Sequence, residues 1–493
     1  MKILDKKISS SPSDLNNFVS CKYLIQNEIK FLNKEIQRNE QSIDQKLWKE
    51  FGLKHENKHF RLFKEKYKKI ISIKQELKED ERFKLTLDAI NKGYDLIYHA
   101  YFIDENFRGE ADFLIKTNTK SKIGNFSYEV YDTKVSRKPR PRHIYQITAY
   151  SSMLSKIQGI LPERMHLIDG SDIVHNYKTK EFLDFYLFTK NNFEKYLKNI
   201  SKEKVYPEKC SHCAVCDYTE VCENIWEKDN YINQVAKINR SQIEKLKKVG
   251  VTTVKQLAEA NIDKLKVKIN KQALKDRISQ AQLQEEKRET GQSKYIILDP
   301  DKGKGFYKLP EPDEGDLFFD IEGFPQEDGR GFEYLHGIYF KNKNDYEFKF
   351  FWAKDFKNKY EKENFVELIK FFKDHFKKYP KAHLYHYNSY EKRSLRQLAS
   401  LYSSDFPEGS NFVDTLLRAE RFVDLFLIIN QCVRTSEKDM SLKSIEGVLY
   451  NFQRKGDVKK AEDSVKLYDY WLTSKDENTK KDIIEYNKED CVS

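Results

Sequence analysis

Four cysteines constrain the first half of this chain more than any other feature of its sequence. One thiol lies near the start, in NNFVSCKYL, and three lie much later, in CSHCAVCDYTEVC; they are Cys21, Cys213, Cys216 and Cys222. A distant thiol combined with a Cys-x2-Cys-x5-Cys group is typical of a metal centre, because thiolates bind zinc and iron–sulfur clusters. Shared ligation would bring these two regions together, which predicts a folded unit that closes near residue 225.

Length, cysteine count and charge set broad limits on the organisation of the chain. Its 493 residues exceed what one hydrophobic core normally supports, which predicts two or three domains. Seven cysteines, an odd number, favour metal binding over disulfides and a cytoplasmic location. No secretory signal and no apolar run long enough for a membrane helix are recognisable. The formal net charge of +11 weakly favours a nucleic-acid partner, although a compositional bias towards Lys, Asn and Ile would produce the same charge.

Hydrophobic periodicity divides the chain into four segments and predicts an α/β multidomain protein. Residues 1–228 are predicted to begin with helices over residues 1 to about 60 and a long helical stretch over residues 61–95, to continue with alternating strands and to return to a helix. Residues 313–493 show a second α/β pattern. Residues 229–295 are predicted as a helical connector similar to a helix-hairpin-helix, with two short helices meeting at Gly250. Such a connector can bind a phosphate or pack between domains, and we favour packing. Residues 296–312, rich in Pro and Gly, are predicted as a linker.

A pattern of carboxylates and a lysine lies between the cysteines. GEADFLIK contains Asp112, and YEVYDTKV contains Asp132 and Lys134. Residues two apart in a strand share a face, so Asp132 and Lys134 are predicted to point the same way. Carboxylates suit Mg²⁺ or Mn²⁺, and a nearby lysine can orient a metal-activated water that attacks phosphorus. The pattern therefore predicts a phosphodiester-cleaving site where two strands end.

The segment that follows extends this predicted site. Gln146 and Tyr150 stand four apart in a predicted helix and hence share one of its faces. The intervening segment KVSRKPRPRH carries positive charge where a DNA backbone would pass, on Lys134, Arg137, Lys138, Arg140 and Arg142.

These motifs resemble the RecB-like branch of the PD-(D/E)XK nuclease superfamily, close to the CRISPR-associated and AddB-type exonucleases with an iron–sulfur cluster. The resemblance covers roughly residues 10–225 and implies a restriction-endonuclease-like α/β core. It implies a site formed by His55, Asp112, Asp132, Lys134, Gln146 and Tyr150, in which His55, Asp112 and Asp132 hold the metal ion. His59 is an alternative to His55, whereas Glu129 is wrongly spaced from the lysine.

The resemblance also implies a structural [4Fe–4S] cluster bound by Cys21, Cys213, Cys216 and Cys222. Zinc held by four thiolates is the alternative, although zinc sites usually consist of two paired knuckles. Cys210 adds an ambiguity, because Cys210-x2-Cys213 is also a ligand spacing.

A second group of carboxylates lies near the end of the chain. FFDIEG places Asp320 and Glu322 on one face of a predicted strand, and EYNKEDC places Tyr486 and Asp490 four apart on a predicted helix. This combination resembles the DEDD exonucleases of the RNase H-like fold. It implies that Asp320, Glu322 and Asp490 hold two metal ions and that Tyr486 orients the attacking water.

The middle motif of this second site departs from the family pattern. Those enzymes usually carry an aspartate after an aromatic residue, whereas here Glu391 follows Tyr390 in YHYNSYEKRSL. Asp414 and Asp424 are alternative carboxylates in helix-start or loop contexts. Cys491, although it adjoins the last motif, is not expected to be a ligand.

Together the motifs predict a metal-dependent DNA nuclease that joins the two modules, the second a 3'-5' exonuclease-like domain. Exonucleolytic processing of DNA ends or single strands, in repair, recombination or defence, is the expected setting. Asp490 lies three residues before the last residue, so we expect a truncated domain and a helicase domain or subunit as a partner. There are two alternatives. One is a non-catalytic DNA-binding subunit with a degenerate second site, and the other is an RNA-processing exonuclease.

Overall fold

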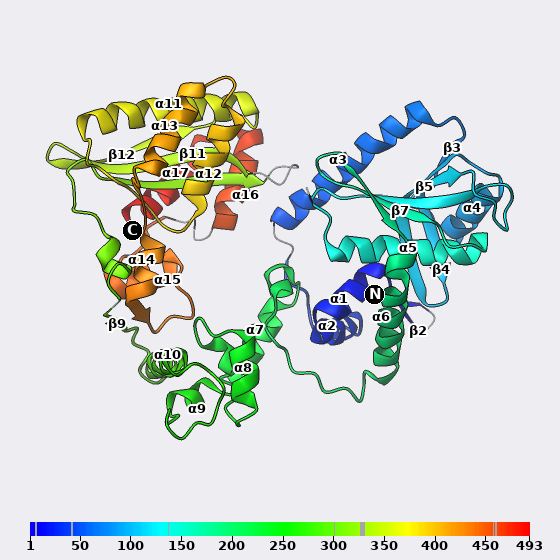
Figure 1. The fold of residues 1–493 in the computed structure, drawn as a ribbon, viewed down its shortest axis with the longest axis horizontal. Coiled ribbons are helices and arrows are strands. Elements are labelled where there is room, and N and C mark those ends of the chain that lie inside the picture. The colour runs from blue at the N-terminus through cyan, green and yellow to red at the C-terminus, as the bar shows by residue number, and fades with distance from the viewer. Residues whose placement is uncertain are drawn as a thin grey trace. The chain divides into compact units, whose positions relative to one another are not determined.

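The computed structural model describes residues 1–493 except 5–6, 41–42, 137, 300, 326–330, 457 and 459–460. The chain divides into two compact units, which we call unit 1 (residues 1–222) and unit 2 (the described part of residues 223–493) (Figure 1). The division falls within helix α7 (Thr219–Lys228), whose last residue is the boundary predicted from the sequence. Among the described residues, no helix is both long and apolar enough to cross a membrane.

Unit 1 contains a six-stranded mixed sheet with the strand order β3-β4-β5-β6-β7-β8. Its strands are β3 (Ile70–Ser72), β4 (Leu96–Asp104), β5 (Phe107–Thr117), β6 (Ser127–Thr133), β7 (Arg164–Ile168) and β8 (Val174–Lys178). β3 pairs with β4 and β6 with β7 in parallel, and the other neighbours are antiparallel. The segments around Asp112 and Asp132 form β5 and β6 because their apolar side chains are buried on both faces of the sheet.

Helices pack on both faces of this sheet. The helices of unit 1 are α1 (Pro12–Ser20), α2 (Lys22–Leu32), α3 (Ile43–Lys66), α4 (Glu79–Asn91), α5 (Pro141–Gln158) and α6 (Lys180–Asn199), followed by the start of α7. Phe60 of α3 stacks on Tyr98 of β4 and shares a core with Phe113. A larger core joins α1, α2, α4, α5 and α6 to the other face. Its centre includes Leu114 and Val130, which are fully buried.

Two short-range predictions for unit 1 are wrong. Residues 1–60 were expected to be helical, yet they begin with paired strands β1 (Lys2–Leu4) and β2 (Lys7–Ser9). The stretch 61–95, expected as one long helix, contains the end of α3, strand β3 and helix α4. Three-residue strands are too short to show periodicity. β1 and β2 pair with each other, whereas β3 depends on β4, which lies beyond helix α4 in the chain.

Unit 2 contains a five-stranded sheet with the strand order β12-β11-β10-β13-β14. Its strands are β10 (Leu317–Pro325), β11 (Gly331–Asn342), β12 (Asp345–Trp352), β13 (Leu384–His386) and β14 (Phe422–Asp424). β10, β11 and β12 are antiparallel, whereas β13 and β14 extend the sheet in parallel from β10. β10 is therefore the central strand, and the polar residues on it lie in the middle of the sheet.

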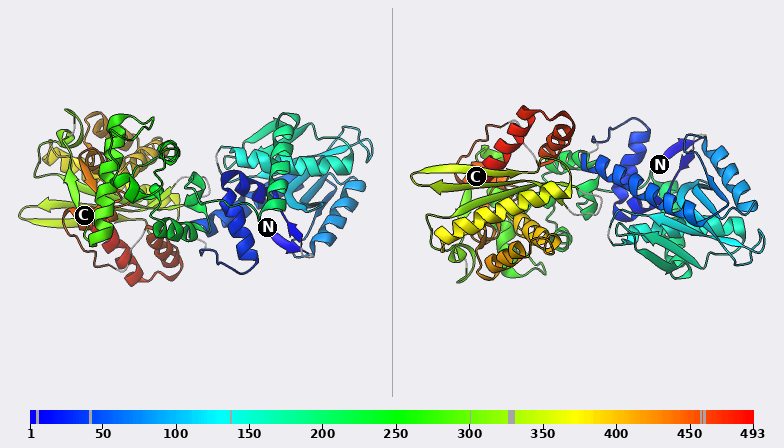
Figure 2. Two further views of the ribbon diagram at one scale, coloured as in Figure 1. Left: turned by 90° about the horizontal axis from the view of Figure 1, so that it is seen from below. Right: turned by 90° about the horizontal axis from the view of Figure 1, so that it is seen from above.

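Alternation along β10 separates the two faces of the sheet. The helices that follow β12 in unit 2 are α11 (Asn358–Lys378), α12 (Tyr390–Leu401), α13 (Pro407–Arg418), α14 (Leu425–Cys432), α15 (Leu442–Leu449), α16 (Ala461–Ser474) and α17 (Glu477–Val492). Phe319 and Ile321 share a core with α11, α12 and α13. Asp320 and Glu322 point to the other face, which α17 covers (Figure 2).

The segment between the units' sheets contains α8 (Arg240–Lys247), α9 (Val254–Ala258) and α10 (Lys271–Thr290). Gly250 between α8 and α9 has a φ of 84°, a left-handed conformation that glycine adopts without strain. Strand β9 (Tyr295–Ile297) pairs with β15 (Val433–Thr435), so the predicted linker at 296–312 begins inside a strand. That pairing joins residues far apart in sequence, which explains why local composition did not predict it.

Candidate active sites and the cysteine cluster

Asp112, Asp132 and Lys134 lie together in unit 1. Asp112 lies within β5 rather than at its end, which corrects our expectation, and Asp132 is close to the end of β6. The backbone N–H and the hydroxyl of Thr133 both donate to Asp112 Oδ2 at 2.7 Å. Lys134 directly follows β6, where its backbone N–H donates to the carbonyl of Ile168 at 2.8 Å, and its ammonium pairs with Asp132. Neighbouring strands thus bring the two carboxylates and the lysine to one place.

The electrostatics of this group favour a bound cation. Burial, followed by the charge of Asp132, raises the pKa of Asp112 well above its usual range. Burial also raises the pKa of Asp132. Burial lowers the pKa of Lys134, but Asp132 and Asp112 outweigh it, so the net shift is upward. The raised pKa values reflect the cost of ionising both carboxyl groups here, and a divalent cation would remove that cost in place of a proton.

Helix α5 brings Gln146 and Tyr150 to the same group. The amide of Gln146 donates to the Tyr150 hydroxyl at 2.9 Å. Burial, and then the charge of Asp132, raises the pKa of Tyr150. Gly109 of β5 permits the close approach of this ring, because a Cβ at that position would collide with it. Both predicted helix residues therefore lie beside the carboxylates.

His55 contacts a different set of residues. Its Nδ1 lies 3.9 Å from Asp172 Oδ1, and His59 Nε2 lies 3.0 Å from the same oxygen. Glu56 is the next residue of α3. After burial, its negative charge contributes to the raised pKa of both Asp112 and Asp132. Sequence reasoning chose His55 and missed Glu56 in the same FGLKHENKH motif, because the choice depends on how the helix is rotated against the sheet.

His99 is a second residue that the sequence did not indicate. Its Nε2 lies 2.5 Å from Glu56 Oε1. The pairing of β4 with β5 continues on both sides of His99 but omits it and Asp112. His99 has a φ of 58°, an unusual value for a histidine inside a strand, and such strain is found most often at functional sites. A local backbone distortion of this kind has no signature in the sequence.

The predicted basic segment leads into α5. Lys138, Arg140 and Arg142 are exposed, and Arg137 lies outside the described residues. Lys138 and Arg140 precede α5, the helix that carries Gln146 and Tyr150, and Arg142 lies in its first turn, so a polyanion bound there would pass close to the carboxylates.

The cysteines of unit 1 line one small cavity. Its lining includes Cys21, Cys210, Cys213, Cys216 and Cys222. Cys21 lies between α1 and α2, two of the others flank a short 3₁₀ turn, and Cys222 lies on α7. Burial raises the pKa of the Cys216 thiol to about 11 and that of Cys222 to about 12, so both are neutral unless a metal binds them.

The spacing of the sulfurs bears on what they could hold. Four thiolates on one tetrahedral zinc ion lie about 3.8 Å apart, as follows from a Zn–S bond of about 2.3 Å. Cys210 Sγ and Cys213 Sγ are 4.0 Å apart. Among the described residues, however, no three cysteine sulfurs form a group within 4.8 Å of one another.

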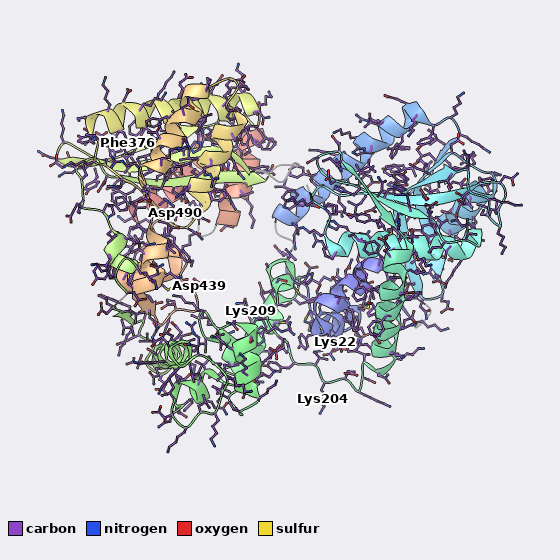
Figure 3. All side chains as sticks on the ribbon, in the orientation of Figure 1. Lys22, Lys204, Lys209, Phe376, Asp439 and Asp490 are labelled. Atoms are coloured by element: carbon purple, nitrogen blue, oxygen red, sulfur yellow. The ribbon has the colours of Figure 1, made fainter. Side chains whose placement is uncertain are left out.

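The second site lies on the central strand of unit 2. Carboxylate oxygens of Asp320, Glu322 and Asp490 all lie within 4.8 Å of one another, and Asp490 is labelled in Figure 3. Asn487 of α17 donates to Asp320 Oδ2 at 2.6 Å. Gly337 of β11 permits this approach, because a Cβ there would collide with the Asn487 side chain. Strand β10 and helix α17 thus converge on one acidic group.

Two cations and a tyrosine border this acidic group. Lys443 donates to the Tyr486 hydroxyl at 2.7 Å. Arg454 donates to Asp490 Oδ1 at 2.5 Å and also pairs with Glu446. The sequence motifs indicated Tyr486 but neither cation, because both come from the segment around α15 and are brought in by tertiary packing.

Glu391 lies close to the acidic group but outside its innermost part. It is in the first turn of α12, is 3% exposed, and its Oε2 lies 3.4 Å from His386 Nδ1. Its charge contributes to the raised pKa of Asp320, after burial and the charges of Asp490 and Glu322. Cys491 is buried beside Asp320.

The two alternative carboxylates have structural partners. Asp414 is exposed and pairs with Arg418 at 2.6 Å, one turn along α13. Asp424 caps the N-terminus of α14, where it accepts from the backbone N–H of Leu427 at 3.2 Å. Glu391 is therefore the better-placed residue for the middle motif.

The acidic group of unit 2 makes stability depend on pH. Burial, and then Asp490, raises the pKa of Glu322 to about 8. The folded protein therefore keeps a proton that the unfolded chain releases above its ordinary pKa of about 4.3. The stability of the metal-free protein should fall as the pH rises from about 5 to 8, by about 1.4 kcal/mol per unit of pKa elevation.

Thermal unfolding of the chelated protein across this pH range measures the effect. Asp320→Asn should flatten the decline, because one of the repelling charges is removed, and Mg²⁺ should oppose it. An equally steep decline in Asp320→Asn would contradict the assignment of the slope to this group.

Comparison with known families concerns the second half of the chain. Residues 317–493 match the family model of the RNase H superfamily. The match begins at β10 and extends through α17, and so includes the whole acidic group of unit 2. It confirms the predicted RNase H-like domain and indicates a nuclease-type phosphodiester hydrolase. No curated protein matches the chain significantly.

Proposed function

We propose that this protein is a metal-dependent DNA nuclease whose second site hydrolyses phosphodiester bonds with two divalent cations. One observation carries the proposal. Three carboxylates from β10 and α17 converge within 4.8 Å in a domain that matches the RNase H superfamily. Grouped carboxylates are hard oxygen ligands of the kind that Mg²⁺ and Mn²⁺ prefer.

Each residue of the second site has a role in this proposal. The divalent cations would activate water and neutralise the attacking and leaving oxygens. Asp320, Glu322 and Asp490 would hold them, and Asn487 keeps the Asp320 carboxylate in one orientation through its 2.6 Å hydrogen bond. Tyr486 would orient the attacking water by a hydrogen bond from its hydroxyl.

Glu391 and the bordering cations complete the second site. Glu391 would act as an additional carboxylate, reached through the longer side chain of glutamate. Lys443 donates to the Tyr486 hydroxyl and Arg454 to Asp490, so each could also approach a phosphate oxygen of the substrate.

The proposal includes a second hydrolytic site in unit 1, of the PD-(D/E)XK type. Asp112 and Asp132 would hold the metal ion, with Glu56 as the third carboxylate. The Lys134 ammonium would position the attacking water, and the Gln146–Tyr150 pair would support the substrate side of the site. Support for this comes from the burial of Asp112 and Asp132 and from the charge of Glu56, which contributes, after burial, to the raised pKa of both.

A [4Fe–4S] cluster held by Cys21, Cys213, Cys216 and Cys222 is proposed for unit 1. Support comes from the common cavity that these cysteine side chains line. The cluster would tie α1 and α2 to α7. Its test is the absorption spectrum of the purified protein: a colourless protein that contains zinc would contradict the proposal.

A non-catalytic DNA-binding subunit is the second candidate function, and one contact favours it. Arg454 pairs with Asp490 at 2.5 Å and so provides charge that a metal ion would otherwise supply. In an inactive site such an internal cation would be sufficient to hold the carboxylates together.

Cleavage assays on three substrates distinguish these functions. The full-length protein is incubated with end-labelled single-stranded DNA, duplex DNA and RNA, with Mg²⁺ or Mn²⁺ and separately with a chelator. We expect cleavage of DNA that requires the metal ion. Absence of cleavage of every substrate would favour the binding subunit, and cleavage of RNA alone would favour an RNA-processing enzyme.

A further inference from the structure

A third group of potential metal ligands lies on α3 and the β7–β8 turn of unit 1. His55 and His59 are one turn apart on α3, and Asp172 lies in the turn with a φ of 63°. Ligand atoms of the three side chains all lie within 4.8 Å of one another. Helix and turn, more than a hundred residues apart in sequence, thus present two imidazoles and a carboxylate to one point.

The distances in this group fit a bound ion. Ligands about 2.0–2.1 Å from a tetrahedral zinc ion lie about 3.3 Å from one another. Asp172 Oδ1 is 3.0 Å from His59 Nε2 and 3.9 Å from His55 Nδ1, values on either side of that spacing. Small side-chain adjustments would therefore suffice to complete the coordination.

The two imidazoles are buried where the ion would bind. His55 and His59 are only 7% and 6% exposed. His55 Nε2 is buried and has no hydrogen-bond partner among the described residues. Two buried imidazoles that face a carboxylate form an arrangement that a bound cation stabilises.

The oxygens of Asp172 have separate roles. Lys58 donates to Oδ2 at 2.6 Å, whereas both histidines lie nearest Oδ1. Lys58 therefore leaves Oδ1 available and holds the carboxylate in place, as outer partners of metal ligands commonly do.

We propose that His55, His59 and Asp172 form a binding site for Zn²⁺ that is separate from both acidic groups. Two imidazoles and one carboxylate favour zinc over Mg²⁺, which prefers oxygen ligands. Three protein ligands leave one coordination position for water. The ion would join α3 to the β7–β8 turn.

The site would also position Glu56. This residue follows His55 on α3, and its charge reaches Asp112 and Asp132. An ion that holds His55 and His59 fixes the rotation of α3 about its axis and hence the direction of the intervening Glu56 side chain. Zinc binding itself is independent of the nuclease proposal, whereas this positioning effect rests on it.

Zinc content and Zn²⁺ affinity of the full-length protein test the proposal, and neither depends on cleavage. Elemental analysis should find one zinc ion per chain fewer in His59→Ala and in Asp172→Asn than in the wild type. Zn²⁺ affinity, measured by competition with a chromophoric chelator, should fall by more than the about 10–100-fold that outer partners contribute. Asp172→Asn keeps the fold testable, because the side chain is exposed and asparagine tolerates the left-handed backbone.

Two further variants separate this site from its neighbours. His175→Ala removes an imidazole that pairs with Asp169 nearby, and Asp132→Asn alters the nuclease group. Both should keep the wild-type zinc content. Unchanged zinc in His59→Ala and Asp172→Asn would overturn the proposal, and so would loss of the ion in Asp132→Asn, which would assign it to the nuclease group.

Cobalt substitution distinguishes the imidazole site from the cysteines. Co²⁺ bound by thiolates has strong near-ultraviolet charge-transfer absorption, whereas Co²⁺ bound by nitrogen and oxygen has only weak visible bands. The Co²⁺ ion that His59→Ala fails to bind should be the one with only weak visible bands. Loss of the thiolate bands instead would contradict the assignment.

Discussion

Asp320→Asn is expected to lower metal-dependent DNA cleavage at the second site by about 10³-fold. A metal ligand stabilises the transition state by several kcal/mol, and about 4 kcal/mol corresponds to this factor. The amide has nearly the same shape as the carboxylate and can accept the hydrogen bond from Asn487, so the fold should persist. Cleavage rates are best measured in a Lys134→Met background, in which the first site is silenced.

An exposed carboxylate provides the matched control for this variant. Asp414→Asn removes the same charge from the surface of α13, where the Asp414 carboxylate pairs with Arg418. It should cleave at the wild-type rate. Equal rates in Asp320→Asn and Asp414→Asn would exclude Asp320 as a ligand and assign the cleavage to a different group.

Lys134→Met is expected to lower cleavage at the first site by about 10²–10⁴-fold, the usual contribution of a group that positions or transfers a proton. The residual activity is measured in an Asp320→Asn background. Methionine retains much of the length of lysine but has no ammonium to pair with Asp132. Breaking a buried ion pair costs about 3–5 kcal/mol, so thermal unfolding must be followed in parallel.

Lys138→Met is the control for this second experiment, because Lys138 is exposed four residues further along the same segment. It should weaken DNA binding at most slightly, with a small change in salt dependence. Undiminished cleavage in the Lys134→Met, Asp320→Asn double variant would show that a different group performs the reaction.

Saturating Mn²⁺ provides an additional check on the Lys134 result. If the lysine only offset the negative charge of Asp112 and Asp132, a higher metal concentration would restore the rate. If it positions the attacking water, the loss should persist at saturating metal, and we expect this outcome.

Motif spacing and the resemblance to the DEDD exonucleases together located the RNase H-like domain, and the family match over residues 317–493 supports it. Asp320 and Glu322 share a strand face, and Tyr486 and Asp490 share a helix face, whatever the remainder of the chain does. The same reasoning paired Asp132 with Lys134 and Gln146 with Tyr150. It failed for β3 and β9, because three-residue strands depend on partners that are distant in sequence.

The sequence by itself determined which side chains share a face within each strand or helix, because backbone geometry sets that spacing. Only the tertiary structure decided which faces meet. The rotation of α3 turns Glu56 towards the aspartates and His55 towards Asp172, although the two residues are adjacent. Packing likewise brings Lys443 and Arg454 to the acidic group of unit 2. These placements depend on how whole helices and strands pack against one another, and no local sequence pattern encodes that packing.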